Sequence, residues 1–416
     1  MDSIQIVGLS GSFGLGMCFA VLGSIAVKMM PRMGIDQAKF GTMISAFMFA
    51  CLIASLVVGV MMDTLGYKLV AIIGFVAAAV AILMLANAKS FGAGVIACIM
   101  LGVGAMACNT TGNVLGTAEV SKLFNGNMAS ANNLVNVFFG LGLFLTPFVV
   151  SFLFQKVSYQ MAVSALGVIV LLPLIVVLLA VYPPTPAGFK LMDAVALLKE
   201  PATILAAFVL FCYIALESSF CNWLAPFGKE VLKNAKPELA GDKVDASAAR
   251  LLSAFAIAMM AGRLTTSLTG IGDMLGGWLI AGAAVVAAVI IIIMTGTKSS
   301  AAAYALALAS GFVFAPAFPT TLGVVFPKFG GPSGSLFGII FAIGLAGAVI
   351  VPKAIGNMAK GASVQKALKL LLPACVILAL LAVGLQYAPD AKSKPAAKHA
   401  VEAPAAPASV TPAPAK

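Results

Sequence analysis

The stretch GVMMDTLGYK, residues 59–68, joins two long apolar segments through a short turn that contains one acid and one base. Gly66 permits a tight turn, because glycine tolerates backbone conformations that other residues avoid. Asp63 can accept hydrogen bonds from backbone N–H groups at a helix start, and Lys68 places a cation close by. The stretch therefore predicts a compact charged hairpin between two helices.

On either side of this hairpin the chain is too apolar for a soluble protein. Only 9% of its 416 residues are charged, against about 25% in soluble domains, and 62% are strongly hydrophobic. A chain with so few charges cannot cover a water-facing surface, so the bilayer is its natural solvent. Segments long enough to span hydrocarbon lie near 8–28, 39–62, 68–88, 91–116, 129–154, 160–182, 201–226, 247–268, 274–295, 300–326, 332–356 and 364–387.

These segments predict an all-α membrane protein whose twelve transmembrane helices form two six-helix bundles. The predicted division is an N-terminal bundle at 1–182, a linker at 183–200, a C-terminal bundle at 201–387 and a tail at 388–416. The tail consists largely of alanine, proline and lysine, which cannot build a packed core, so we expect it to be disordered.

The two halves repeat weakly. The sequence Asn-Thr-Thr at 109–111 has a counterpart, Pro-Thr-Thr at 319–321, which lies 210 residues further along the chain. Parallel halves related by an axis along the membrane normal place a substrate site between them, near the middle of the membrane. The repeat therefore favours a central site formed by both bundles.

The hairpin, G-x-x-x-D-x-x-G-x-K, resembles the loop between helices 2 and 3 in the major facilitator superfamily. That resemblance implies the superfamily's fold and a conformational latch made of Gly59, Asp63, Gly66 and Lys68. Within the superfamily the chain is similar to the fucose, galactose and glucose symporters of the fucose permease type. The stretches that carry this similarity are DTLGYKLVAIIG (63–74), NTTGNVLG (109–116), NNLVNVFFGLG (132–142), YIALESSFCNWL (213–224) and GRLTTS (262–267).

The chain departs from that family at positions that bear on ion coupling. Where the family often carries an acidic residue in helix 1, this chain has Val21. The acidic or glutamine position of helix 4 is Asn109, the glutamine of helix 5 is Asn136, and a second asparagine there is Phe139. Sugar binding survives such changes more easily than proton coupling does, so a sodium-linked carrier or a uniporter stays open.

Glu217 is the one carboxylate near the middle of an apolar segment. A charge at that depth costs a few kcal/mol, so the side chain should face a cavity or a partner, and it is a functional candidate. It could accept hydrogen bonds from sugar hydroxyls, carry the coupling proton, or bind Na⁺. Alternatively it is structural and pairs with Arg263. Tyr213 lies one helical turn earlier, on the same face.

Neutral polar side chains cluster in helices 4, 5 and 7. Amides and hydroxyls donate and accept directionally without requiring a charged ligand, which suits an uncharged polyol. The candidate substrate-binding residues are Asn109, Thr110, Asn113, Asn133, Asn136, Tyr213, Glu217, Asn222 and Trp223. The alternatives are hydrogen bonds between helices for the amides and an interfacial anchor for Trp223.

No cofactor or metal site is expected. The sole histidine, His399, lies in the tail, and the seven cysteines lie singly in apolar segments. We find no pairing of a nucleophile with a base and no phosphate-binding loop, so the sequence does not indicate an enzyme. The net charge of +11 is spread over loops and tail, which favours an anionic membrane surface over nucleic acid.

The distribution of basic residues conflicts with the orientation that the family resemblance implies. If both termini are cytoplasmic, ten of the 25 lysines and arginines lie on that side and fifteen on the other. The positive-inside rule predicts the reverse. We nevertheless expect a multi-pass protein of the plasma (inner) membrane, acting as a monomer, with cytoplasmic termini.

The sequence thus predicts a secondary transporter of a small neutral solute, a monosaccharide, working by alternating access and coupled to H⁺ or Na⁺ through Glu217. The alternatives are a sugar uniporter, an exporter of a lipophilic metabolite or drug, and a transporter-derived sensor or tail-anchored scaffold that binds its ligand without moving it.

Overall fold

The computed structural model describes residues 1–184, 191–235, 237–238, 241–359 and 363–391. Among these residues it has twelve helices that are long and apolar enough to cross a membrane. The prediction of an all-α protein with twelve spans is therefore confirmed. Most of the predicted tail, from 392 onward, and residues 185–190 of the predicted linker lie outside the described residues.

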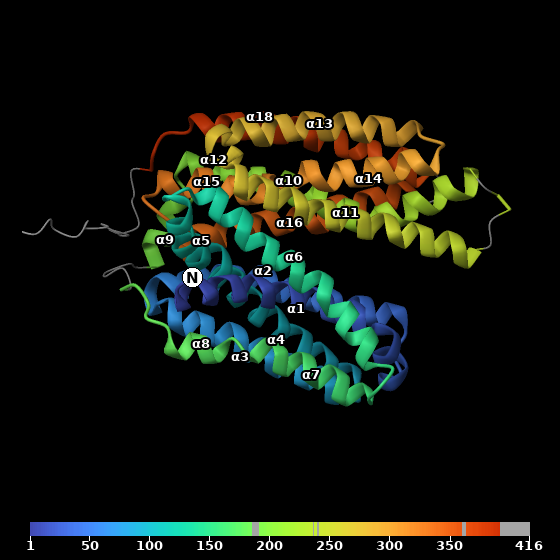
Figure 1. The fold of residues 1–416 in the computed structure, drawn as a ribbon, viewed down its shortest axis with the longest axis horizontal. Helices are drawn as coiled ribbons and strands as arrows, with labels where there is room; N and C mark the ends of the chain where they lie inside the picture. The colour runs from blue at the N-terminus through green and yellow to red at the C-terminus, as the bar shows by residue number, and fades with distance from the viewer. Residues whose placement is uncertain (185–190, 236, 239–240, 360–362, 392–416) are drawn as a thin grey trace, which may run out of the picture.

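The first six spans form one bundle, coloured blue to green in Figure 1. Its helices are α1 Ser3–Met33, α2 Gln37–Leu65, α3 Tyr67–Asn87, α4 Phe91–Thr110, η1 Thr111–Gly116, α5 Thr117–Val120, η2 Ser121–Phe124, α6 Met128–Leu153, α7 Tyr159–Leu171 and α8 Leu174–Leu179. The fourth span thus runs through α4, a π-helical stretch (η1) and α5. Such π-helical insertions occur frequently at functional sites.

The last six spans form a second bundle, coloured green to red in Figure 1. A short helix in the linker region, α9 Leu191–Leu197, precedes it. Its helices are α10 Pro201–Ala235, α11 Gly241–Thr269, α12 Ile271–Leu275, α13 Gly277–Gly296, α14 Ser300–Phe314, α15 Ala317–Lys328, α16 Gly334–Ala359, α17 Val364–Ala367, η3 Leu368–Leu370 and α18 Leu371–Tyr387.

The tenth span is interrupted where α14 ends and α15 begins. Ala315 and Pro316 lie between the two helices. Proline lacks a backbone N–H and cannot continue the hydrogen-bond ladder of α14. The second proline of this region, Pro319, lies inside the first turn of α15, where proline is tolerated.

The two bundles pack against each other at the end of the molecule that carries the N-terminus, and they diverge toward the opposite end (Figure 1). The contacts between them run from α2 to α16, and from α6 to both α11 and α15. At the first of these contacts the backbones meet closely. A Cβ atom on Gly59 would lie 2.9 Å from the carbonyl carbon of Gly334 and 3.3 Å from the Cα atom of Gly338.

Candidate functional site

The carboxylate of Asp63 at the end of α2 binds the start of α16, a helix of the other bundle. One oxygen accepts from the backbone N–H of Gly334 at 2.8 Å. The other accepts from the N–H of Ser335 at 2.7 Å and from the hydroxyl of Ser333 at 2.8 Å. The side chain is buried, with 5% exposure. A helix start presents free N–H groups and partial positive charge, so the carboxylate holds the two bundles together there.

The other residues of the predicted latch have separate roles. Gly59 allows α2 and α16 to approach closely, and Gly66 has a φ of +94°, which favours glycine. Lys68 points elsewhere: its ammonium donates to the carbonyl of Leu178 at the end of α8, at 2.9 Å. It therefore satisfies a helix end within its own bundle.

A second carboxylate makes the same kind of contact in the opposite direction. Asp273 of α12 accepts from the backbone N–H groups of Ala129 and Ser130, at 2.8 and 2.9 Å, where α6 begins. It also accepts from the Ser130 hydroxyl at 2.5 Å. Here a loop of the C-terminal bundle binds a helix start of the N-terminal bundle. We call the contacts of Asp63 and Asp273 the first and second latch.

Sequence reasoning missed the second latch, although a signal for it exists. Asp63 and Gly66 have counterparts at Asp273 and Gly276, each 210 residues further on. This is the offset that relates the Thr-Thr pairs of the fourth and tenth spans. Gly276 also has a positive φ, of +52°.

Glu217 of α10 and Arg263 of α11 form an ion pair on the side of the C-terminal bundle that faces the N-terminal bundle. The Nη2 atom of Arg263 lies 3.4 Å from the Oε1 atom of Glu217. Glu217 retains 22% side-chain exposure, whereas Arg263 retains 3%. Arg263 also donates from Nη1 to the carbonyl of Asn136 on α6, at 3.3 Å, and its guanidinium lies 5.8 Å from the ring centre of Phe139. The pair thus lies where both bundles meet.

Arg263 is only partly satisfied by these contacts. Its Nε atom is buried and has no hydrogen-bond partner among the described residues. The hydroxyl of Tyr213, one turn before Glu217, is also buried without such a partner. The Tyr213 ring faces Phe318 of α15, with ring centres 6.3 Å apart.

Four asparagines bind one another between α4, η1 and α6. Asn113 donates to the side chain of Asn109 at 2.7 Å, and its own oxygen accepts from Asn132 at 3.1 Å and from Asn136 at 3.0 Å. Asn132 also donates to the hydroxyl of Thr117. All four amides are buried. The structure therefore brings Asn109, Asn113 and Asn136 together as a buried network between neighbouring helices.

The remaining predicted site residues lie apart from this network. Thr110 donates to the carbonyl of Met106, within its own helix. Asn133 donates to the carbonyl of Ala129, and its side-chain oxygen is buried without a partner among the described residues. Because Ala129 contacts Gly323 of α15 and lies one turn before Asn133, that side chain lies on the α6 face toward the C-terminal bundle.

On α10, beyond Glu217, the side chains differ in orientation. Trp223 donates from Nε1 to the carbonyl of Pro352 at 3.0 Å, and its ring lies against Gly356 of α16. Asn222 is exposed. All seven cysteines lie in the described part of the chain, and Cys221, one turn after Glu217, is the exposed one.

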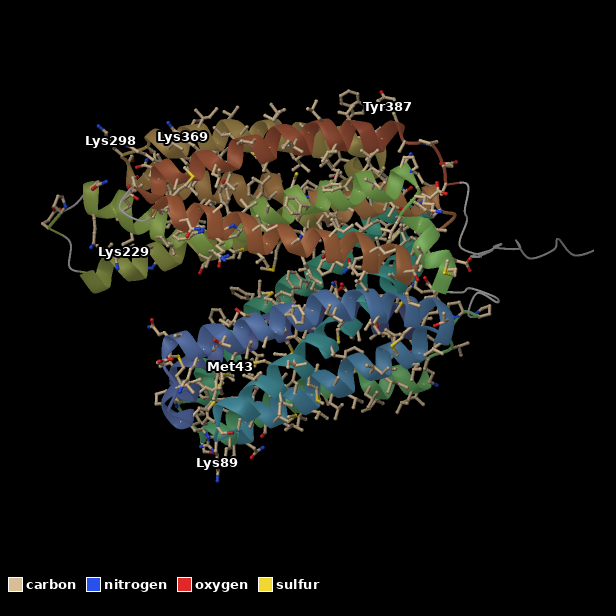
Figure 2. The ribbon with its side chains drawn as sticks, turned by 180° about the vertical axis from the view of Figure 1, so that it is seen from behind. Met43, Lys89, Lys229, Lys298, Lys369 and Tyr387 are labelled. Atoms are coloured by element: carbon tan, nitrogen blue, oxygen red, sulfur yellow. The ribbon has the colours of Figure 1, made fainter. Side chains whose placement is uncertain are left out.

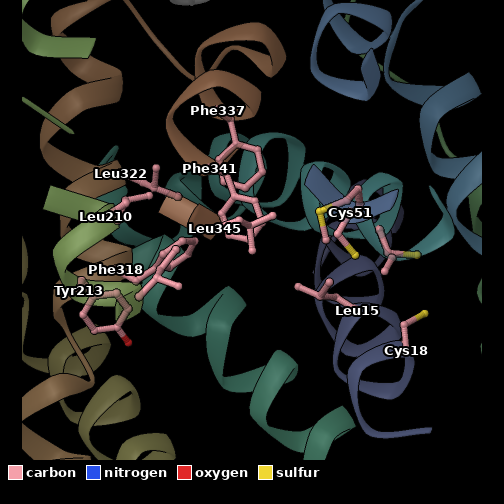
Figure 3. Close-up of a cluster of buried hydrophobic side chains, with 14 of the residues drawn as sticks. Leu15, Cys18, Cys51, Leu210, Tyr213, Phe318, Leu322, Phe337, Phe341 and Leu345 are labelled. Carbon is pink, nitrogen blue, oxygen red and sulfur yellow. The ribbon is translucent and has the colours of Figure 1, made fainter. Parts of the chain in front are cut away.

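Buried apolar side chains from both bundles form a cluster near the interface of the bundles. Figure 3 shows Phe337, Phe341 and Phe318 of the C-terminal bundle gathered on one side and Leu15 and Cys51 of the N-terminal bundle on the other. The ring centres of Phe337 and Phe341 are 5.4 Å apart, and those of Phe341 and Phe318 are 6.1 Å apart. At the ion pair itself, the ring of Phe139 lies beside Arg263, and an aromatic face next to a charged pair suits a ligand with both polar and apolar surfaces.

The end of the molecule opposite the latches is strongly basic. Lys89, Lys229, Lys298 and Lys369 are labelled there in Figure 2. We define the basic rim as the described lysines and arginines at the helix ends and loops of this end: Lys28, Arg32, Lys39, Lys89, Lys156, Lys229, Lys233, Arg250, Lys298, Lys366 and Lys369. The described carboxylates at the same end are Asp36, Glu230 and Glu238.

Among the described residues no group of three His, Cys, Asp or Glu side chains could hold a metal ion. The arrangement offers instead one ion pair, aromatic faces and two interbundle latches. Between the two bundles, such a site offers a small ligand a guanidinium, a carboxylate and an aromatic ring.

Comparisons with known proteins identify the family and the fold. The sequence model of the Major Facilitator Superfamily matches residues 8–352. The human MFS-type transporter SLC18B1 is 29% identical over 212 residues, which cover 50% of this chain. The chain spans 46% of the length of that human relative.

Two solved structures show the same fold at low identity. The Escherichia coli fucose:proton symporter FucP (N162A) matches with a TM-score of 0.72 and 18% identity, over 92% of this chain and 99% of that one. The human organic anion transporter MFSD10 matches with a TM-score of 0.70 and 14% identity, over 91% and 99%.

Proposed function

Because this chain belongs to the major facilitator superfamily, we propose that it carries a monosaccharide or a closely similar polyol across the membrane by alternating access. The structural likeness to FucP, a fucose:proton symporter, supports a sugar-sized solute. The observation that carries the proposal is the Glu217–Arg263 pair, which lies beside Asn136 and Phe139 of the other bundle.

Such a pair can bind hydroxyl groups, and their binding can change the contacts of the pair with both bundles. Glu217 accepts and Arg263 donates, so adjacent sugar hydroxyls can bridge them. The neighbouring rings offer apolar faces for the carbon skeleton. Since Arg263 also donates to the backbone of α6, a solute that alters the pair alters the contact between the bundles.

We assign the coupling role to Glu217. A carboxylate in the membrane interior that partly loses its cation partner becomes costly to keep charged. Binding a proton or Na⁺ then restores neutrality before the bundles move. The two latches close the end near the N-terminus in this state. With that end in the cytoplasm, Glu217 and Cys221 face the outside.

The test is uptake of radiolabelled hexoses and deoxyhexoses into proteoliposomes, with proton and sodium gradients imposed separately. We expect accumulation under one gradient, and we expect Glu217→Gln to abolish it while leaving slow equilibration. Glu238→Gln, which changes an exposed carboxylate on a loop, is the matched control and should accumulate normally.

Other outcomes would point elsewhere. Equilibration that ignores both gradients would indicate a uniporter and give Glu217 a binding role alone. Full accumulation by the Glu217→Gln variant would remove its coupling role. No flux of any sugar would contradict the proposed solute and leave export of a lipophilic metabolite as the next hypothesis.

A further inference from the structure

If the N-terminus lies in the cytoplasm, as the proposed function has it, membrane topology does not explain the basic rim. In bacterial and eukaryotic membranes alike, short loops rich in lysine and arginine usually face the cytoplasm. With the N-terminus in the cytoplasm, the rim lies on the other side, around the end where the bundles diverge (Figure 2). Basic residues that gather on the side disfavoured by the positive-inside rule indicate that they have a function there.

Among the described residues of this end, three carboxylates accompany the eleven basic residues of the rim, and two of the three bind helix starts. Asp36 accepts from the backbone N–H of Lys39 and caps α2. Glu230 accepts from the Ser363 hydroxyl and the N–H of Gln365 at the start of α17. The rim therefore has a net positive potential, which extends over a Debye length of about 8–10 Å at physiological salt and raises the local concentration of anions.

The central site contains a second, independent sign of an anionic ligand. Arg263 is 97% removed from solvent, given its 3% exposure, yet its Nε–H donates to no described residue. Its contact with Glu217 is a single one of 3.4 Å, longer than the roughly 2.7–2.9 Å of a strong charge-assisted bond. A guanidinium binds carboxylates best through two parallel bonds. This one has donor capacity left for another carboxylate.

We propose that the solute is a monosaccharide bearing a carboxylate, of the hexuronate or aldonate class, and that its carboxylate binds Arg263 in place of Glu217. This inference rests on the proposed function, since it specifies the substrate class of the same site. The sugar hydroxyls still bind Glu217, and the ring keeps the aromatic contacts proposed above. The basic rim concentrates the anion at the mouth of the site.

The exchange at Arg263 also defines the coupling. When the solute carboxylate binds the Arg263 guanidinium, Glu217 loses its partner. It then binds one proton from the side of the membrane from which the solute entered. One negative charge and one proton then enter together. Transport is therefore electroneutral, so a membrane potential imposed without a pH gradient drives no accumulation.

The experiment compares three labelled probes in wild-type proteoliposomes with an inward proton gradient: glucuronate, glucose and glucose 6-phosphate. We expect glucuronate uptake to exceed glucose uptake at least tenfold. The phosphate ester should be taken up poorly, because its second charge has no partner. Raising the ionic strength from about 20 to 300 mM should lower kcat/KM for glucuronate several-fold by screening the rim.

Two sets of variants separate the site from the rim. Arg263→Gln should abolish glucuronate uptake, and Arg263→Lys should retain a small part of it. Lys89→Gln combined with Lys298→Gln should leave uptake at saturating glucuronate unchanged and reduce the salt dependence. Because an Arg263 variant can fail to fold, we also measure alkylation of Cys221 in the wild type, which bound glucuronate should slow.

The outcomes distinguish this inference from the proposed function. Glucose uptake with exclusion of glucuronate, and no protection of Cys221 by glucuronate, would overturn the inference and leave the proposed function standing. Absence of uptake for both sugars would overturn both. Glucuronate uptake that follows membrane potential would refute the exchange at Arg263.

Discussion

The two latches use the same chemistry in opposite directions. Asp63 belongs to the N-terminal bundle and binds the start of α16. Asp273 belongs to the C-terminal bundle and binds the start of α6. Each carboxylate accepts from two backbone N–H groups and from one serine hydroxyl. The difference lies in their surroundings. Asp63 is buried, whereas Asp273 is partly exposed.

This difference in burial indicates how much each latch contributes to the stability of the closed end, by which we mean the end near the N-terminus where the two bundles pack together. Charged hydrogen bonds are worth more where water is excluded, because the competing solvent contacts and screening are absent. The first latch should therefore hold the closed end more strongly than the second. Close backbone packing supports both of them, through Gly59 against Gly334 and through Gly323 against Ala129.

The largest effect should come from filling the close contact beneath the first latch. Gly59→Leu places a side chain where the backbones of Gly334 and Gly338 lie, so the closed end cannot form. We expect solute uptake to fall at least a hundredfold with normal insertion into the membrane. Gly92→Leu is the control, because nothing lies within 4 Å of a Cβ atom at that position.

Neutralising the first latch should have the next largest effect. Asp63→Asn keeps the shape but removes the charge that faces the start of α16. Hydrogen bonds to charged groups contribute about 1.5–3 kcal/mol, so we expect roughly a thirtyfold loss of uptake. Uptake near the wild-type level would show that Asp63 does not hold the closed end.

The same change in the second latch should cost less. Asp273→Asn acts at a partly exposed carboxylate, where about 1 kcal/mol, or roughly a fivefold loss of uptake, is expected. Measured together with Asp63→Asn, the double variant should lose more than either single variant. Equal losses from the two single variants would contradict the ranking by burial.

The sequence predicted the first latch but not the second. The apolar segments fixed the number of spans, and the hairpin at 59–68 indicated the first latch. The partner of Asp63 could not be predicted, because Gly334 lies 271 residues further along the chain and offers only backbone N–H groups. Asp273 was overlooked because its loop carries no lysine or arginine to complete the pattern.

The candidate site was also only partly predictable from the sequence. Depth in an apolar segment was enough to single out Glu217, and its structural alternative, a pair with Arg263, is present in the structure. The asparagines were selected as possible ligands because sequence spacing shows which residues share a helix face. It does not show that Asn113 and Asn136 bind each other across two helices. The partner of Trp223 could not be predicted either, because the carbonyl of Pro352 lies on α16, 129 residues further along the chain.

The most direct test of the account is the rate at which Cys221 reacts with a membrane-impermeant maleimide. Both latches keep the end near the N-terminus closed, and the region around Glu217 and Cys221 is then open toward the other end. The double variant Asp63→Asn with Asp273→Asn should therefore react several-fold more slowly than the wild type, since loosening the closed end shifts the protein toward the opposite state. An unchanged rate in a correctly inserted double variant would contradict the account.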